Sequence, residues 1–132
     1  MHAAAEPGYF KPFHAEPIAK WFQSILSRDD ARAWIADADG QPVGYACAFF
    51  YDRPESPFCL PRRWCELDQI AVEPGSRKHG VGRMLVEAVL GAARADGFPE
   101  VELTTWHFNA EARRLFCEMG FASRSERFVC RP

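Results

Sequence analysis

The sequence lacks any long apolar run, and no stretch approaches the ~20 consecutive apolar residues that a membrane-spanning helix needs. It also lacks the apolar segment near the N-terminus that marks a secretory signal peptide. An excess of charge of one sign is absent too, because the formal net charge is −2 at pH 7. These absences predict a cytoplasmic protein with no general attraction to nucleic acid or to a membrane.

Cysteine is present without any spacing typical of a metal site. The five cysteines form an odd set without a C-x-x-C pair: Cys47, Cys59, Cys65, Cys117 and Cys130. We expect them to be small buried hydrophobic residues in a reducing compartment. We expect no bound metal.

The most informative stretch joins an apolar strand to a Gly-rich basic loop that opens a helix. It runs from Glu66 to Leu85. At the start of a helix, backbone N–H groups lack intrahelical partners and the helix dipole adds partial positive charge. Gly80 and Gly82 carry no Cβ, so a ligand can approach the backbone closely. The stretch therefore predicts a phosphate-binding loop, with added charge from Arg77, Lys78 and Arg83.

Two common phosphate motifs fit this loop poorly. The Walker motif requires Lys followed by Ser or Thr where this chain has Val81-Gly82. The dinucleotide fingerprint requires a third glycine where Leu85 stands, and its loop follows the strand directly, whereas residues 73–76 intervene here. A nucleotide triphosphatase and a Rossmann site are therefore disfavoured.

A third pattern, Arg-x-x-Gly-x-Gly, is found at residues 77–82 after Ile-Ala-Val-Glu-Pro at residues 70–74. Here the sequence resembles the GCN5-related N-acetyltransferase (GNAT) family, in which this loop holds the pyrophosphate of acetyl-coenzyme A. Residues 109–121 also look like the family's later N-x-x-A-x-x-L-Y…GF segment. The resemblance implies that acetyl-CoA is the acyl donor. It implies contacts to coenzyme A from Ile70, Ala71, Val72, Arg77, Lys78, His79, Gly80, Val81, Gly82, Arg83, Asn109 and Phe116.

The hydrophobic pattern predicts a single mixed α/β domain over residues 1–132. After an irregular arm, residues 1–13, apolar residues at helical spacing predict a core helix over 18–26. Extended segments at 33–36 and 43–51 predict a hairpin that turns at Asp39-Gly40. The remaining elements are a Pro-rich loop at 53–61, a strand at 62–72, a helix from about 80, a strand at 101–105, a helix between Asn109 and Gly120, and a final strand at 121–129.

The order of these elements predicts a mixed sheet. A strand, helix and strand of this length form a right-handed crossover with parallel strands, which places the loop at the carboxyl end of a parallel pair. The resemblance implies the same order and an acyl-CoA N-acyltransferase fold. In that fold the pantetheine arm lies between two splayed strands, here around 70–72 and 103–105. The family's usual first strand and helix have no counterpart, so we expect an exposed sheet edge or a homodimer that covers it.

The implied reaction is transfer of an acetyl group from a thioester to a primary amine of a small molecule or a protein. Glu66 and Asp68 stand on the strand that leads into the loop, and their spacing places them on one face. Family members place a catalytic glutamate or a water-holding acid at one or other position, so either residue is a candidate general base acting through water. The alternative is that they project into solvent or pair with Arg62 or Arg63.

Phe116 departs from the family pattern, because many members have Tyr there as proton donor to the coenzyme A thiolate. The general acid is therefore unassigned. Asn109 has two interpretations, as a helix N-cap or as a contact to coenzyme A. Two functions remain open: an N-acetyltransferase, and an acyl-CoA-binding module of the same fold with little or no turnover.

Overall fold

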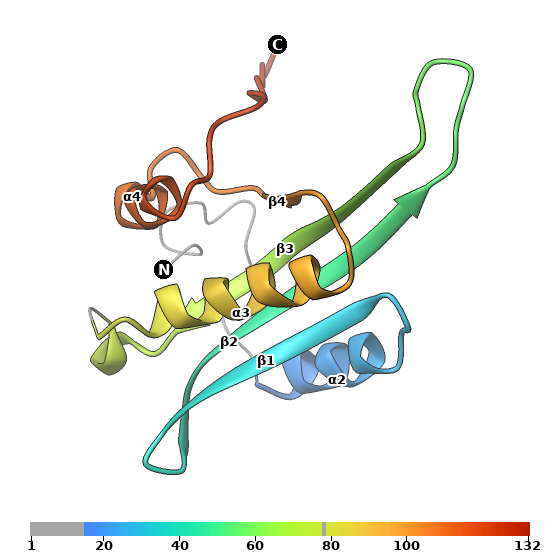
Figure 1. Cartoon of the computed structure of the whole chain (residues 1–132). Coiled ribbons are helices and arrows are strands. Elements are labelled where there is room, and N and C mark those ends of the chain that lie inside the picture. Colours follow the sequence, from blue (N-terminus) through green and yellow to red (C-terminus); the bar gives the residue numbers. More distant parts are fainter. Residues whose placement is uncertain (1–14, 78) are drawn as a thin grey trace.

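A computed structural model describes residues 15–77 and 79–132 of the chain. The expected N-terminal arm and Lys78 lie outside the described residues. The elements in chain order are helix α2 (Ala15–Leu26), strands β1 (Ala31–Ala38), β2 (Gln41–Arg53) and β3 (Arg62–Val72), the 3-10 turn η1 (Pro74–Ser76), helix α3 (Val81–Ala95), strand β4 (Val101–Leu103) and helix α4 (Ala110–Glu118). Figure 1 shows α3 lying across the sheet, with a long β2–β3 hairpin projecting beyond it.

The sheet confirms the predicted mixed topology. Its strand order is β1-β2-β3-β4. The pairs β1–β2 and β2–β3 are antiparallel, whereas the pair β3–β4 is parallel. Helix α3 therefore makes the expected crossover, and it begins at the carboxyl end of β3.

The predicted hairpin turn is also confirmed. Asp39 and Gly40 have positive φ angles of 51° and 81°. This is the left-handed conformation that a two-residue turn between twisted antiparallel strands requires, and Asp-Gly adopts it readily. The flanking strands are longer than predicted, because cross-strand pairing extends them to Ala31 and Arg53.

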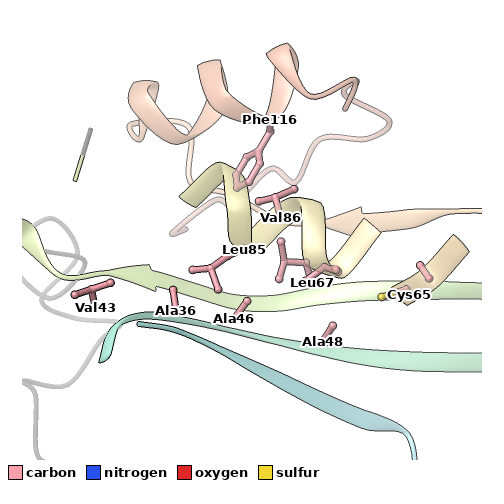
Figure 2. Packing of buried hydrophobic residues seen from close by; sticks show 11 residues of the cluster. Ala36, Val43, Ala46, Ala48, Cys65, Leu67, Leu85, Val86 and Phe116 are labelled. Atoms are coloured by element: carbon pink, nitrogen blue, oxygen red, sulfur yellow. The ribbon is translucent and has the colours of Figure 1, made fainter. Parts of the chain in front are cut away.

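Buried apolar side chains form a cluster on each face of the sheet. On the α3 face, Cys65 and Leu67 pack with Leu85, Val86 and Val89 of the helix, and Figure 2 shows Leu85 and Leu67 between α3 and the sheet. On the other face, α2 inserts Ile25 against Cys47 and Phe49 of β2. Alternate residues of β2 thus serve opposite faces, as the period of a strand requires.

Three details of the sequence prediction are wrong. Residues 121–132 form no strand, and β4 ends at Leu103 instead of continuing to residue 105. A strand needs a neighbouring edge to pair with, and the apolar pattern alone does not provide one. Leu26 is 60% exposed, so the core stripe of α2 ends at Ile25.

The expectation for the cysteines holds only in part. All five are free, and Cys47 and Cys65 are buried. Burial raises the pKa of the Cys65 thiol to about 11, so this side chain stays neutral. The other three are exposed, because they lie on the β2–β3 loop, on the outer side of α4 and on the C-terminal tail.

Gly44 lies where α3 packs closely against the sheet. A Cβ there would lie 2.9 Å from the carbonyl oxygen of Ala71, and 3.2 Å and 3.3 Å from the side chains of Val81 and Leu85. We expect Gly44→Ala to lower the free energy of unfolding by about 1–3 kcal/mol, because backbone or helix must shift.

Gly91 provides the matched control for this substitution. A Cβ at Gly91 would meet nothing within 4 Å, so Gly91→Ala in the interior of α3 should raise the free energy of unfolding by about 0.5–1 kcal/mol. Denaturant unfolding measures both variants. Equal stability of the two would contradict the packing described here.

Candidate acyl-transfer site

Strands β3 and β4 pair over a short length and then part. The Cα partners are Cys65 with Val101, Glu66 with Glu102, and Leu67 with Leu103. Strand β3 then continues to Val72 while β4 stops. Within the described chain, no strand pairs with residues 68–72 on this side of β3, as the resemblance implied. Apart from the Val72 carbonyl oxygen, which accepts a hydrogen bond from Arg77, the backbone groups that face away from β2 are available to an extended ligand arm.

A β-bulge marks the point where the strands part. The pairing of β2 with β3 changes from Cys47–Gln69 to Ala48–Leu67, which leaves Asp68 as the extra residue. Before the bulge, Leu67 joins the core on the α3 face; after it, Ile70 and Val72 do. The regular alternation assumed from the sequence therefore shifts by one residue at Asp68, and the sequence carries no clear signal for this shift.

Glu66 and Asp68 make no ion pair with any described residue. Arg62 pairs with Glu102 and Glu100, and Arg63 pairs with Asp52 at 3.6 Å. The alternative that these arginines neutralise Glu66 or Asp68 is therefore wrong. The structure leaves both carboxylates available to a ligand.

The two carboxylates differ in their surroundings. Glu66 is half-buried and Asp68 is exposed. Neighbouring atoms still shield the Asp68 carboxyl from water in part, and this desolvation raises its pKa. Burial also raises the pKa of Tyr51, and the negative charges of Glu66 and Asp68 raise it further. Both acids therefore act electrostatically on the same tyrosine of β2.

The loop after β3 leads into the N-terminus of α3. Gly80 precedes the helix with φ of 79°, in the left-handed region that glycine adopts without strain. Among the described residues, no side chain caps this helix. Its first backbone N–H groups are thus open to an anion, as predicted.

The basic side chains of this loop have different roles. Arg77 donates from Nε to the carbonyl oxygen of Val72 at 3.3 Å, which ties the loop to the end of β3. Arg83 forms an exposed ion pair with Glu118 of α4 at 2.8 Å. Exposed pairs of this kind contribute little to stability, so an anionic ligand can compete for Arg83. His79 is exposed.

Gly82 brings the end of β3 and helix α4 together at the loop. A Cβ on Gly82 would lie 3.4 Å from Cδ2 of Leu115 in α4 and 3.9 Å from Cγ2 of Val72. The start of α3 therefore packs between the end of β3 and α4, which carry the two separate motifs of the family resemblance. The fold brings the Gly-rich loop and the later motif into one site.

Asn109 is the N-cap of α4. Its side-chain oxygen accepts a hydrogen bond from the backbone N–H of Ala112 at 3.2 Å. The helix ends at a Schellman motif, in which Gly120 has φ of 96° and the N–H of Phe121 donates to the carbonyl oxygen of Phe116. The capping interpretation is confirmed, whereas a contact to coenzyme A stays a prediction.

Asn109→Ala is expected to lower the free energy of unfolding by about 1 kcal/mol, because the Ala112 N–H loses its acceptor. Asn109→Asp keeps an acceptor in place and should retain the stability of the native chain. Thermal unfolding of the two variants tests the cap, and an unchanged Asn109→Ala variant would refute it.

Phe116 belongs to the core. It is 7% exposed and packs against Phe121 with ring centroids 5.8 Å apart. Figure 2 shows its ring directed from α4 toward Val86 of α3. With so little exposed surface, the ring serves mainly the packing of α4, and its contact with a pantetheine arm stays a prediction.

Sequence reasoning missed an apolar cavity beside the site. It has a volume of about 530 Å³ and lies between α2, the β1–β2 hairpin and the end of β3. Its lining includes Phe22, Trp34 and Tyr45, and it reaches Val72 and Glu73 next to the loop. The spacing of Phe22 and Leu26 on α2 was the available signal, but it indicated only a core-facing stripe.

The described residues contain neither a membrane-spanning helix nor a metal-binding cluster. None of the described helices combines the length and the apolar character needed to cross a membrane. Nowhere in residues 15–77 and 79–132 do three His, Cys, Asp or Glu side chains form a group that could hold a metal ion. The cytoplasmic location stays a prediction.

Comparison with known sequences points to one family. A family model described as "Acetyltransferase (GNAT) family" matches residues 1–121. N-acetyltransferase family 8 member 3 of Mus musculus is 32% identical over 106 residues, which cover 80% of this chain and 45% of the relative. N-acetyltransferase 8 of Homo sapiens is 31% identical over 108 residues, with 82% and 46% covered. The chain spans about half the length of these curated relatives.

Solved structures agree with this comparison. The aminoglycoside N-acetyltransferase AAC(6')-Iy in complex with CoA is similar with a TM-score of 0.73 and 25% identity, over 88% of this chain and 86% of that one. A tetramutant of the BH1408 protein from Bacillus halodurans has a TM-score of 0.92 and 18% identity, over 99% and 85%. The second likeness concerns the fold alone.

Proposed function

Because this chain belongs to the acetyltransferase (GNAT) family, we propose that it transfers the acetyl group of acetyl-CoA to a primary amine of a small molecule or a protein. One observation carries the proposal. Residues 66–83 carry three features in order. These are two carboxylates without an ion pair, a stretch of β3 that does not pair with β4, and a helix start without a side-chain cap. A thioester donor whose pantetheine arm leads to a charged diphosphate matches this order.

The donor would bind along β3. The N–H groups of Val81, Gly82 and Arg83 hold the pyrophosphate, with Arg77 and His79 beside it. A contact from Lys78, which lies outside the described residues, stays a prediction from the sequence. At about 3.3 Å per residue, the free stretch from Asp68 to Val72 is about 13 Å long, which suits an extended arm that pairs with backbone groups of residues 70–72. The thioester then lies near the bulge at Asp68.

The acceptor would approach from the α2 side of the sheet. Tyr51 and Trp64 lie there with ring centroids 5.0 Å apart and ring planes tilted by 31°, and beyond the effect of burial the negative charges of Glu66 and Asp68 raise the pKa of Tyr51. An aromatic wall beside two carboxylates suits an amine, because carboxylates and aromatic faces both attract an ammonium group.

The chemical step needs one proton acceptor. Glu66 or Asp68, through a water molecule, takes the proton from the amine as its nitrogen attacks the thioester carbonyl. The C–S bond then breaks and coenzyme A leaves as a thiolate, which water can protonate. Asp68 stands at the point where the strands part, and its raised pKa makes it a stronger base than a fully solvated aspartate. Phe116 has no hydroxyl to donate, so no side chain is assigned as acid.

The test is release of coenzyme A thiol from acetyl-CoA in the presence of a panel of amines. The panel contains polyamines, amino acids, an aminoglycoside and a peptide with a free α-amine, and a blank corrects for the exposed cysteines. We expect release that depends on one class of amine. Tight binding of acetyl-CoA without release for any amine would instead indicate the acyl-CoA-binding module.

A further inference from the structure

Strand β2 carries two tyrosines on the face that α2 covers, and their hydroxyl groups differ. The Tyr45 hydroxyl donates to Oε1 of Gln69 at 3.2 Å. The Tyr51 hydroxyl makes no hydrogen bond with any residue that the structure describes. Because no polar side-chain atom of those residues is both buried and without a partner, the Tyr51 hydroxyl is accessible from outside. It can therefore donate a hydrogen bond to a ligand and accept one from it.

The ring of Tyr51, unlike its hydroxyl, is held by neighbouring side chains. Tyr51 and Trp64 are Cα partners in the ladder between β2 and β3, and their ring centroids lie 5.0 Å apart. The ring of Phe49, two residues earlier on β2, lies 6.3 Å from that of Tyr51. The Tyr51 ring also packs against the apolar cluster that includes Ile25 and Cys47. The fold therefore presents this hydroxyl from a nearly fixed position.

Four charged side chains act on Tyr51: Glu66, Asp68, Arg28 and Asp30. Arg28 and Asp30 pair with each other through two hydrogen bonds of 2.8 and 2.7 Å, whereas the two acids of β3 have no ion-pair partner in the described chain. Glu66 is the Cα partner of the residue two positions before Tyr51. It is therefore the diagonal neighbour of Tyr51 on the same face, which is within reach of long side chains.

Tyr51 keeps its proton at neutral pH. Burial raises the pKa of its phenol and Glu66 raises it further, as do the other two acids, whereas Arg28 lowers it. A neutral phenol has an oxygen lone pair that can accept an N–H, and an O–H that can donate to a carboxylate. Tyr51 is thus a hydrogen-bonding group and not a base.

A primary amine that attacks a thioester needs two hydrogen-bond acceptors. Its lone pair points at the carbonyl carbon, and its two N–H groups point away from that carbon. In the function proposed above, on which this inference rests, one N–H proton passes through water to Glu66 or Asp68. The nitrogen gains positive charge as the C–N bond forms, so leaving the other N–H without an acceptor would cost free energy.

We propose that the Tyr51 hydroxyl oxygen accepts this second N–H and so makes the site selective for primary amines over secondary ones. The nitrogen lies between a phenol of β2 and a carboxylate of β3, with its lone pair directed at the thioester beside Asp68. Tyr51 keeps its own proton throughout. The amine gives one proton to the carboxylate, the C–N bond forms, and the C–S bond breaks as coenzyme A leaves. A secondary amine has one N–H, which the base takes, so Tyr51 adds nothing to its binding.

Thiol release with a primary amine that the chain accepts, and with the N-methyl derivative of that amine, tests this role. Tyr51→Phe keeps the ring and its packing and removes only the hydroxyl. For the primary amine, kcat/KM should fall about 10- to 100-fold, the loss expected for one hydrogen bond to a charged nitrogen. For the N-methyl derivative the fall should be much smaller, so the preference for the primary amine should shrink. The affinity for coenzyme A should not change.

Tyr45→Phe is the matched control, because it removes a hydroxyl from the same face of the same strand, together with the hydrogen bond to Gln69. It should retain the native kcat/KM for both amines. Full activity of Tyr51→Phe beside an active native chain would overturn this inference and leave the proposed function standing. Equal losses for the two amines, or in the two tyrosine variants, would also overturn it. A native chain that releases thiol with no amine would overturn the proposed function and this inference with it.

Discussion

The double variant Glu66→Gln, Asp68→Asn is expected to turn over about 10²–10⁴ times more slowly than the native chain, with its affinity for acetyl-CoA unchanged. Both substitutions keep the size of the side chain and remove the proton acceptor. Among the described residues, no arginine depends on either carboxylate for its ion pair, so the fold should remain stable. Thiol release at saturating amine measures the loss.

The single variants show which carboxylate is the base, because the two differ in pH dependence. Partial burial raises the pKa of Asp68 above its ordinary value of 3.8, and the protonated acid cannot accept a proton from the amine. If Asp68 is the base, kcat/KM of the native chain falls as the pH drops through this raised pKa. Asp68→Asn should abolish this fall in kcat/KM at low pH.

The raised pKa of Asp68 affects stability and activity in opposite directions as the pH changes. A carboxyl whose pKa is raised in the folded state favours folding below its unfolded pKa, and this contribution is lost as the pH rises through the folded value. At pH 7, Asp68→Asn should therefore be no less stable than the native chain.

Asp52→Asn, which removes an equivalent charge on β2 outside the site, is the control for activity and should retain it. Full activity in both single variants and in the double variant would remove the general-base proposal.

Gly82→Asp is expected to weaken binding of coenzyme A by about 10- to 100-fold. The added carboxylate lies in the first turn of α3, where it repels the pyrophosphate and competes for the N–H groups that would hold it. One or two hydrogen bonds to a charged group correspond to a loss of this size. The nearest atom to the new Cβ is 3.4 Å away, which is ordinary contact. Isothermal titration with coenzyme A measures the change.

Gly91→Asp is the matched control, because it adds the same charge to the same helix. A Cβ at Gly91 would meet nothing within 4 Å, and the position lies well beyond the first turn. Its affinity for coenzyme A should stay within about twofold of the native value, since the helix-terminal effect falls off within one turn. An equal loss in both variants would mean that the loop is not the binding site.

Local signals explain which parts of the fold could be predicted from the sequence. Asp39-Gly40 specifies its turn through backbone conformation, and Asn109 and Gly120 specify the ends of α4 through hydrogen bonds to nearby residues. Residues 62–72 were bounded by prolines on both sides, and β3 has these bounds. Each signal acts over a few residues, so no knowledge of the rest of the chain was needed.

The features that failed depend on distant parts of the chain. The pattern at residues 121–129 is that of a strand, but strand formation requires an edge, and the tail uses none within one chain. Likewise, Glu66 and Asp68 are unpaired because Arg62 reaches across to Glu102 on β4 and Arg63 reaches Asp52 on β2. The bulge at Asp68 arises from the pairing of β2 with β3. The types of residue at the site could be predicted, whereas their ion pairing and their register could not.

Hydrogen exchange of the full chain with and without coenzyme A tests the central claim most directly. If the start of α3 and the parted edge of β3 form the donor site, coenzyme A should slow exchange at residues 80–83 and at residues 70–72 together. Gly82→Asp should abolish both effects at the same ligand concentration. Unchanged exchange in these two segments, with protection elsewhere or none at all, would contradict the account.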